Sequence, residues 1–252
     1  MKNYKIEALI IAAGIVVFGF VLKSAVNRFI EKERVVSVKG LAETDVVADL
    51  VVWPLVYKEA GNDPAEMYET ITRKNAIIVA FLKANGITDD EISISPPSVY
   101  DKQADRYNDD RSAYRYKASS VITVTSKKVD AVRGIMQQQA ELLKQGIAIV
   151  GDEYQYRVSY EFTALNEIKP AMIEEATKNA RSAAEKFAKD SDSSLGKIRN
   201  ANQGTFTITN RDENTPYIKH VRVVTTVTYY LENYLKTEES RRKTALFFFV
   251  CK

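Results

Sequence analysis

Alternating apolar and polar positions predict several β-strands in the chain. The most regular alternation gives one apolar face, made of Tyr154, Tyr156, Val158, Tyr160 and Phe162. The same period predicts further strands over 91–95, 116–124, 205–209 and 221–231. Another strand is expected over 46–57, which is apolar on both faces. Within it, Pro54 indicates a sheet edge or a bulge.

Three helices are expected from their start and stop signals. The first begins at 63–66, where Asp-Pro-Ala-Glu has the pattern of a capping box with proline in the first turn, and it ends at Asn85-Gly86. The second runs from Ser126 to Gly146, and the third begins near Asn166. Helical spacing predicts their buried faces: Met67, Ile71, Ile78, Phe81 and Leu82; Val129, Val132, Met136 and Leu143; Met172, Ala176, Ala180, Ala183 and Phe187. The alanines should let the third helix lie close to a sheet.

These elements occur in a repeated order of strand, helix, strand, strand, first over 46–125 and again over 153–231. The helix-opening residues Pro64 and Pro170 lie 106 residues apart, as do other matching features. A structural duplication and a coincidence of element lengths both account for this spacing. The expected fold is α+β, with antiparallel or mixed sheets and long helices packed on them. One possible arrangement of these elements has two similar halves, each with the order strand, helix, strand, strand.

The N-terminus predicts a membrane helix in addition. Residues 8–22 contain no charged or hydrogen-bonding side chain and span roughly 23 Å as a helix, and flanking lysines that snorkel bring this near the ~30 Å hydrocarbon core. An uncleaved anchor and a cleaved signal peptide share this layout. The anchor is favoured because cleavage after Ala25 would place Lys23 where a small residue is needed. The predicted membrane contacts are Ala8, Ile10, Ile15, Val16, Phe18, Phe20 and Leu22.

Charge divides the chain into three parts. Residues 1–34, the anchor or signal segment, carry a net charge of +3, and the tail 236–252 carries another +3, so that the body 35–235 carries about −3. A body without positive excess has no electrostatic footprint for nucleic acid, and no nucleic-acid partner is expected. The tail ends in an apolar run, in which Phe247, Phe248 and Phe249 are candidates for contact with a membrane or another subunit. A disordered end is the alternative.

The search for catalytic chemistry returns no candidate. One histidine, His220, and one cysteine, Cys251, exclude a zinc site made of Cys and His. The chain has no glycine-rich phosphate loop and no GxSxG motif. The acidic stretch 101–110 lacks the glycine and terminal glutamate of an EF-hand, so a solvated loop is expected there. No catalytic, cofactor-binding or metal-binding residue is therefore predicted, and an enzyme is the least favoured class.

Several segments resemble the SIMPL domain family in collinear order from about 35 to 232. VSVKGLAE at 36–43 is similar to the family's opening strand, and NGITDDEI at 85–92 to the turn after its first long helix. YKASSVITVT at 116–125 and VVTTVTYYL at 223–231 resemble later strands, and the alanine-rich segment 171–189 resembles its long helix. One departure is Val-Val-Ala-Asp at 46–49, where the family usually has Pro-Asp.

The resemblance implies a bacterial, exported or membrane-anchored protein that is not an enzyme, in a family some of whose members assemble into ring-like or channel-like oligomers. With the predicted anchor, it leads to a single-pass membrane protein with an extracytoplasmic, periplasmic body that self-associates. A cleaved segment would give an exported soluble form instead. The alternative function is a binding module, in which a groove between the two halves captures a small molecule or another envelope protein. A tyrosine-lined cleft would favour binding, and buried tyrosines with a flat apolar edge would favour assembly.

Overall fold

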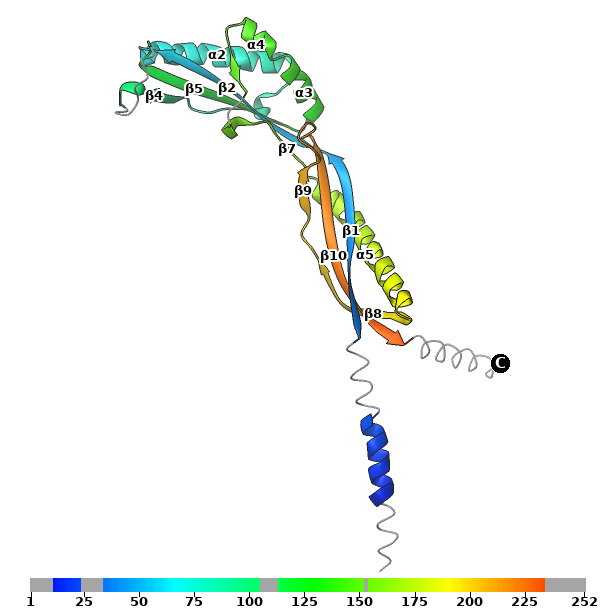
Figure 1. Cartoon of the computed structure of the whole chain (residues 1–252). Coiled ribbons are helices and arrows are strands. Elements are labelled where there is room, and N and C mark those ends of the chain that lie inside the picture. Colours follow the sequence, from blue (N-terminus) through cyan, green and yellow to red (C-terminus); the bar gives the residue numbers. More distant parts are fainter. Residues whose placement is uncertain (1–10, 24–33, 105–112, 152–153, 234–252) are drawn as a thin grey trace, which may run out of the picture. The chain divides into compact units, whose positions relative to one another are not determined.

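The computed structural model describes residues 11–23, 34–104, 113–151 and 154–233 (Figure 1). These residues fall into two compact units. Unit 1 takes its described residues from Met1–Thr44, Asn166–Thr207 and Arg222–Lys252, and unit 2 takes them from Asp45–Leu165 and Ile208–Val221. Each unit contains an antiparallel sheet and helices, which confirms the expected α+β class.

Unit 2 is built on a six-stranded sheet in the order β3–β5–β2–β6, in which β4 also pairs with β5 and β7 also pairs with β2. The central strands are β2 (Leu50–Gly61) and β5 (Tyr116–Ser126), which stay in antiparallel register without a shift. The outer strands are β3 (Ile92–Ile94), β4 (Ser98–Asp101), β6 (Ile149–Val150) and β7 (Ser159–Glu161). Every second residue of β5 from Ala118 is buried, so the alternation predicted over 116–124 is confirmed.

The helix α2 (Pro64–Ala84) packs on one face of this sheet. Its N-terminus is capped as predicted, because the Asp63 Oδ1 accepts a hydrogen bond from the Ala65 N–H at 2.8 Å. Its C-terminus is followed by Gly86, whose φ of 91° is the left-handed conformation that favours glycine. The five residues predicted to face the core are all buried: Met67, Ile71, Ile78, Phe81 and Leu82.

The single helix predicted from Ser126 to Gly146 is wrong. Two shorter helices occupy this segment, α3 (Val129–Gln137) and α4 (Ala140–Lys144). The break between them shifts the helical phase, so Leu142 is buried whereas the predicted Leu143 is 63% exposed. Ser126 is the last residue of β5, and the N-cap position of α3 belongs to a later residue.

The long strand predicted over 154–162 is also wrong in extent. Residues Tyr154–Tyr156 form a 3₁₀ turn, η3, and only β7 (Ser159–Glu161) is a strand. Alternating burial is nevertheless present from 156 to 162, where the even-numbered residues are half-buried and the odd-numbered residues are exposed. The strand is short because only Leu50–Val52 of β2 pair with it.

The strand predicted over 46–57 is divided between two elements, because β1 ends at Val47 and β2 begins at Leu50. At Pro54 there is no bulge, but no described strand pairs with the second side of β2 there, so the position is a local edge as one of the two predicted alternatives requires. The strand β2 has β5 along one side and β7 and β6 along the other, and Pro54 lies between the residues that pair with β7 and those that pair with β6. Since neither strand pairs at this position, the missing N–H of the proline need not interrupt the sheet.

Unit 1 is built on a four-stranded sheet in the order β1–β10–β8, with β9 also paired to β10. The strands are β1 (Val35–Val47), β8 (Ser193–Gln203), β9 (Thr207–Asn210) and β10 (Ile218–Asn233). The alternation predicted over 221–231 is confirmed, since β10 buries Val221, Val223, Thr225, Val227 and Tyr229. The strands β1, β9 and β10 each continue from one unit into the other.

The helix α5 (Leu165–Asp190) lies along this sheet. The predicted close approach is confirmed at Gly40 of β1, where a Cβ atom would lie 1.8 Å from the Ala176 carbonyl oxygen. Contact this close leaves room for alanine but not for phenylalanine, so the predicted Phe187 is 61% exposed. The buried line of α5 instead steps by four residues, through Met172, Ala176, Ala180, Ala184 and Ala188.

The two units share an order of elements. In unit 2 the central strand β5 pairs with β2, β3 and β4, and in unit 1 the corresponding strand β10 pairs with β1, β8 and β9. The helix precedes the last three strands in both sets. The predicted boundaries of the second half are wrong at its start, because the first strand of the unit 1 sheet is β1 and not the segment beginning at 153.

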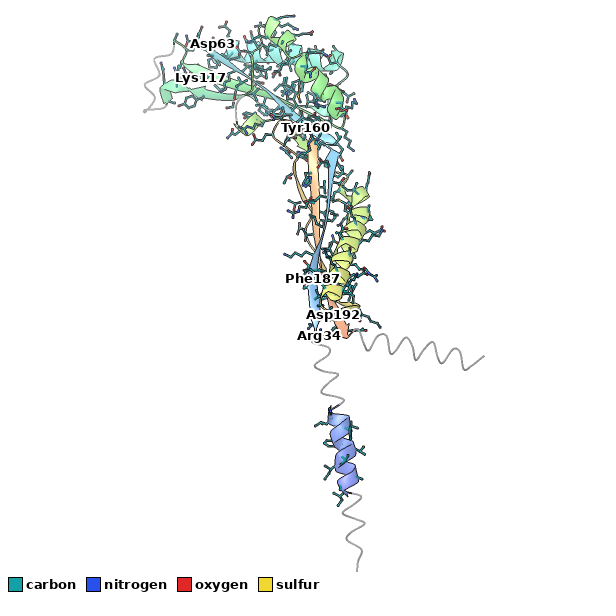
Figure 2. The ribbon with its side chains drawn as sticks, turned by 45° about the vertical axis from the view of Figure 1, so that its right-hand side comes forward. Arg34, Asp63, Lys117, Tyr160, Phe187 and Asp192 are labelled. Atoms are coloured by element: carbon teal, nitrogen blue, oxygen red, sulfur yellow. The ribbon has the colours of Figure 1, made fainter. Side chains whose placement is uncertain are left out.

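The described chain enters and leaves unit 1 at the same end. The Leu231 N–H donates a hydrogen bond to the Arg34 carbonyl oxygen at 2.9 Å, and the Arg34 Nη2 donates to the Ser193 Oγ at 3.1 Å. Arg34 and Asp192 mark this end in Figure 2. Residue 34, which follows the N-terminal segment, is therefore a neighbour of the residues that precede the C-terminal tail.

Candidate functional site

The single histidine, His220, lies in the strand β10. The His220 Nδ1 lies 2.8 Å from the Asp45 Oδ1, and the two residues belong to the neighbouring strands β10 and β1. In the described part of the chain, no three His, Cys, Asp or Glu side chains come together in a way that would hold a metal ion. Cys251 lies outside the described residues.

The described start of the acidic stretch 101–110 is bound to β5. The Arg115 Nε and Nη2 donate hydrogen bonds to the Asp101 carboxylate at 3.1 and 2.8 Å. The hydrogen bonds from Arg115 hold the pKa of Asp101 below its usual value. Asp101 thus joins the end of β4 to the start of β5, and the stretch from 105 onward lies outside the described residues.

A carboxylate with a strongly lowered pKa, Glu91, lies just before β3 in unit 2. The Ser126 Oγ donates to the Glu91 Oε1 at 2.6 Å, and the Thr88 N–H donates to Oε2 at 2.9 Å. The Lys128 Nζ lies 3.3 Å from Oε2. The hydrogen bond from Ser126, then those from Thr88 and Lys128, lower the pKa of Glu91 to about 2. This network joins three segments of the fold and places no reactive group in a cavity.

The tyrosines are divided between the core and the surface. The buried Tyr57 hydroxyl donates to the Asn75 Oδ1 at 2.8 Å, and burial raises the pKa of Tyr57. The rings of Tyr160 and Tyr217 pack edge to face, with their centroids 6.2 Å apart. Of the predicted apolar face over 154–162, Tyr156 contributes to a cavity, as described next.

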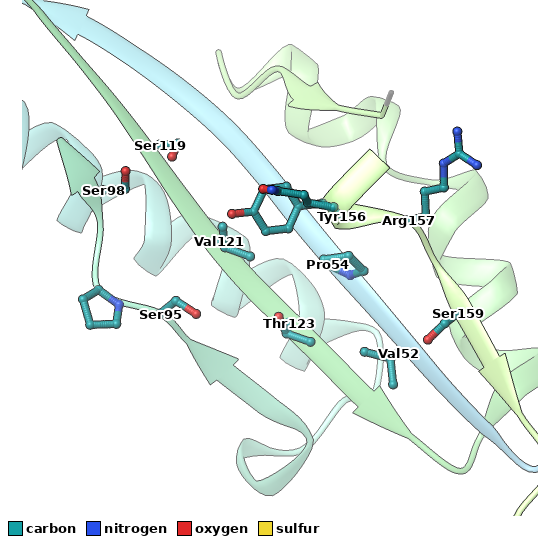
Figure 3. Close-up of a pocket in the computed structure, with 12 residues that line it drawn as sticks. Val52, Pro54, Ser95, Ser98, Ser119, Val121, Thr123, Tyr156, Arg157 and Ser159 are labelled. Carbon is teal, nitrogen blue, oxygen red and sulfur yellow. The ribbon is translucent and has the colours of Figure 1, made fainter. Parts of the chain in front are cut away.

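A groove of about 410 Å³ lies on the face of the six-stranded sheet opposite α2 (Figure 3). Its floor is formed by the residues of β2 and β5 that alternate with the core positions, namely Val52, Pro54, Ser119, Val121 and Thr123. One wall is the connection between β3 and β4, with Ser95, Pro96 and Ser98. The other wall is the segment around η3 and β7, with Gln155, Tyr156, Arg157 and Ser159. The groove lies within unit 2, whereas the predicted groove was placed between two halves.

An apolar margin lies along β3 and β4 in the same sheet. Ile94 is 50% exposed and Val99 is 57% exposed, although they pair with Ile122 and Ala118, whose side chains are buried on the α2 face. The apolar face of the sheet therefore continues beyond the area that the described residues cover. Among the described strands, β3 and β4 each pair only with β5.

Neither the groove nor this margin was predicted. Alternation along β5 identifies Ser119, Val121 and Thr123 as a separate face, which is the only sequence signal for the floor. The walls come from segments about 60 residues apart in the sequence, and no local pattern relates them. The exposure of Val99 depends on which side chains of other elements reach β4, and the sequence does not show that.

The predicted membrane contacts are only partly described. Residues 11–23 form a helix, and the large apolar side chains on it, including Ile15, Val16, Phe18, Phe20 and Leu22, are 53–71% exposed. Within the described ranges, no helix combines the length and the apolar character needed to cross a membrane. Ala8 and Ile10 lie outside the described residues, as do Phe247, Phe248 and Phe249.

Comparison with known protein families matches residues 36–229 to SIMPL, described as a protein of unknown function (DUF541). Comparison with curated proteins gives no match. The matched region contains the sheets of both units from the second residue of β1 to Tyr229 in β10. It also contains the segments at 36–43, 85–92 and 116–125 that resemble the family in sequence. The chain therefore belongs to the SIMPL family.

Proposed function

We propose that this SIMPL protein is a non-enzymatic component of the cell envelope, held to the membrane by its N-terminal segment, whose subunits associate through the β3–β4 margin of unit 2. The proposal places the body outside the cytoplasm, in the periplasm. The observation that carries it is the uncovered apolar margin formed by Ile94 and Val99. Edge strands with exposed apolar residues favour pairing with another strand.

A second copy of the chain is a suitable occupant of this margin. Among the described strands, those that contain Ile94 and Val99 pair only with β5, so a further strand can add on the side away from β5. A strand from another copy would cover both side chains and extend the sheet. Attachment to a membrane raises the effective concentration of the copies relative to one another, so that even a short pairing segment suffices.

The N-terminal segment supports attachment by its composition and exposure. Residues 8–22 contain no charged side chain, and the large apolar side chains described within them are more than half exposed. Removal of such side chains from water provides about 25 cal/mol per Å². In the described part of the chain, Arg34 is hydrogen-bonded to Leu231, and in the sequence the residues from 236 to 252 carry a net charge of +3. A basic segment close to an anchor adds attraction to anionic lipid.

Assembly is tested by the molar mass of the full chain in a zwitterionic detergent, measured by light scattering after size exclusion. We expect a discrete oligomer for the wild type and a loss of mass for Val99→Lys, because a lysine on an edge strand opposes pairing. Leu143→Lys is the matched control, since Leu143 is 63% exposed in the same unit but lies on α4. A monomeric wild type, or equal masses for the two variants, would contradict the proposal.

Attachment and topology are tested on membranes from cells that express the full chain. We expect the wild type to remain in the membrane fraction after alkaline extraction and Phe18→Asp to be released, since a charge within the apolar segment opposes insertion. Protease added outside cells with a permeabilised outer layer should digest the body. Complete protection of the body would reverse the proposed topology.

The groove on the other face of the unit 2 sheet favours a second candidate function, a binding module. A cavity of about 410 Å³ falls in the range of roughly 300–1,000 Å³ that is common for small-molecule sites. This function is compatible with assembly, because the groove and the β3–β4 margin are formed by different side chains.

A further inference from the structure

We infer that the groove of unit 2 binds an uncharged saccharide. The inference names the ligand class of the second candidate function above and does not depend on self-association. It rests on three observations: which side chains line the groove, how few of them are charged, and how the flat apolar surfaces and the hydroxyl groups are arranged around it (Figure 3).

The lining is rich in hydroxyl groups. Five of the lining residues are serine or threonine: Ser95, Ser98, Ser119, Thr123 and Ser159. Among the described residues, no side chain or backbone group forms a hydrogen bond with any of these five hydroxyls. A hydroxyl group both donates and accepts hydrogen bonds, which allows it to pair with either role of a ligand hydroxyl. The groove therefore offers hydrogen-bonding capacity that the fold itself does not use.

The charge of the lining opposes an ionic ligand. No aspartate, glutamate or lysine lines the groove, and Arg157 is the one charged residue among its lining side chains. In Figure 3 the Arg157 side chain extends away from Pro54 and Thr123 on the floor. A ligand that lies on the floor consequently meets hydroxyl and apolar groups and no fixed charge. The floor is complementary to a neutral polar molecule, because an ionised group placed there would find no ion-pair partner among the floor side chains.

The apolar part of the lining is flat and lies between the hydroxyls. Tyr156 extends across β2 toward Val121, and the Pro54 ring lies beside it on the floor. A pyranose ring presents C–H groups on its faces and hydroxyls around its rim. Such a ring would place its apolar face on Tyr156 or Pro54 and direct its rim to the serines of both walls. The groove thus offers an apolar surface for the ring face of a sugar and hydroxyl groups for its rim.

A peptide strand is a poorer match for the groove. Extended peptides are usually held by backbone hydrogen bonds at a free sheet edge. The floor strands β2 and β5 are paired with each other at eleven consecutive positions, from Val51↔Ser126 to Gly61↔Tyr116. The floor is therefore the face of a sheet and presents side chains, so recognition there depends on side-chain hydroxyls.

The test is saturation-transfer NMR and calorimetry on the full chain in a detergent without a sugar headgroup. The probes are maltotriose and chitotriose as neutral trisaccharides, a trimer of galacturonic acid as the charged analogue, and a Gly-Ser hexapeptide. We expect at least one neutral trisaccharide to bind, and to bind at least tenfold more tightly than the charged trimer and the peptide. Absence of binding by both neutral trisaccharides, or tighter binding of the charged trimer or the peptide, would overturn the inference.

Variants locate the site and separate it from assembly. Ser119→Tyr should fill the groove and weaken binding at least tenfold, whereas Thr125→Tyr should leave it unchanged. Thr125 lies on the same face of β5 but outside the lining, so it is the matched control. Tyr156→Ala removes an apolar surface without adding bulk, and it should also weaken binding at least tenfold. Val99→Lys should retain binding, and equal affinity for all four variants would refute the assignment of the site.

Discussion

Replacement of Gly40 by alanine should selectively destabilise unit 1. The added Cβ would lie 1.8 Å from the Ala176 carbonyl oxygen and 2.5 Å from the Ala180 nitrogen. Both atoms belong to the backbone of α5, so no side-chain rotation relieves the contact, and the helix must move by more than 1 Å. Overpacking of a core typically costs about 1–3 kcal/mol, and displacement of a whole helix places this change at about 3 kcal/mol or more.

The same substitution at another glycine serves as the control. Gly134 lies in α3, where an added Cβ meets no atom within 4 Å. Gly134→Ala should therefore stabilise the protein, by about 0.5–1 kcal/mol, because alanine favours the helix and glycine does not. The two variants differ from the wild type by the same methyl group, and the structure predicts opposite signs for them.

Urea unfolding of the full chain, followed by circular dichroism, gives the change in the free energy of unfolding. Hydrogen exchange measured by mass spectrometry then locates it. Faster exchange is expected for Gly40→Ala in peptides from β1 and α5, with little change in β2 and β5, because Gly40 packs on α5. A Gly40→Ala protein within about 0.5 kcal/mol of the wild type would refute the close packing of α5 on β1.

Two carboxylates of unit 2 provide further predictions. The pKa of Glu91 is about 2 in the folded protein, so its contribution to stability is complete above its unfolded pKa near 4.5 and is lost as the pH falls towards 2. Glu91→Gln should accordingly lower stability by about 1–2 kcal/mol at pH 7, after allowance for solvent screening, and by less at pH 3, as measured by urea midpoints from Trp53 fluorescence. The Asp49 carboxylate accepts hydrogen bonds from the Thr163 and Ala164 N–H groups at 2.8 Å. Asp49→Ala should cost about 1–2 kcal/mol and speed amide exchange just before α5, and unchanged exchange there would contradict a capping role.

The first helix of unit 2 was predictable in full because its signals are local. Asp63 and Pro64 define its start, Gly86 follows its end, and one periodic stripe defines its buried face. The segment 154–162 has an equally regular pattern and yet forms mostly a turn and a three-residue strand. A strand needs a partner, and β2 supplies only three residues for pairing with β7. Alternation predicts which side chains are buried, whereas the length of the strand depends on the neighbour.

The same distinction explains why Phe187 was misplaced. Helical spacing allows the line of contact on α5 to pass through either Ala183 and Phe187 or Ala184 and Ala188. The choice depends on how close the helix lies to the sheet, and that distance is set by Gly40, which is more than 130 residues away in the sequence. Helix propensity and the spacing of apolar residues describe α5 alone. The line of contact depends on both α5 and β1, so these signals do not determine it.

The two walls of the groove on the unit 2 sheet have different origins in the chain. Both sheets have a central strand with three antiparallel neighbours, and both have a helix packed on one face. One wall of the groove belongs to this common arrangement, because it connects β3 to β4. The other wall, with Tyr156 and Ser159, belongs to the segment that joins β5 to α5. The segment that joins β5 to α5 has no counterpart in the other set of elements. Its side chains can therefore line the open face of the unit 2 sheet without changing the helix-on-sheet packing that both sets share. A change at Tyr156 should therefore affect binding and leave both cores intact.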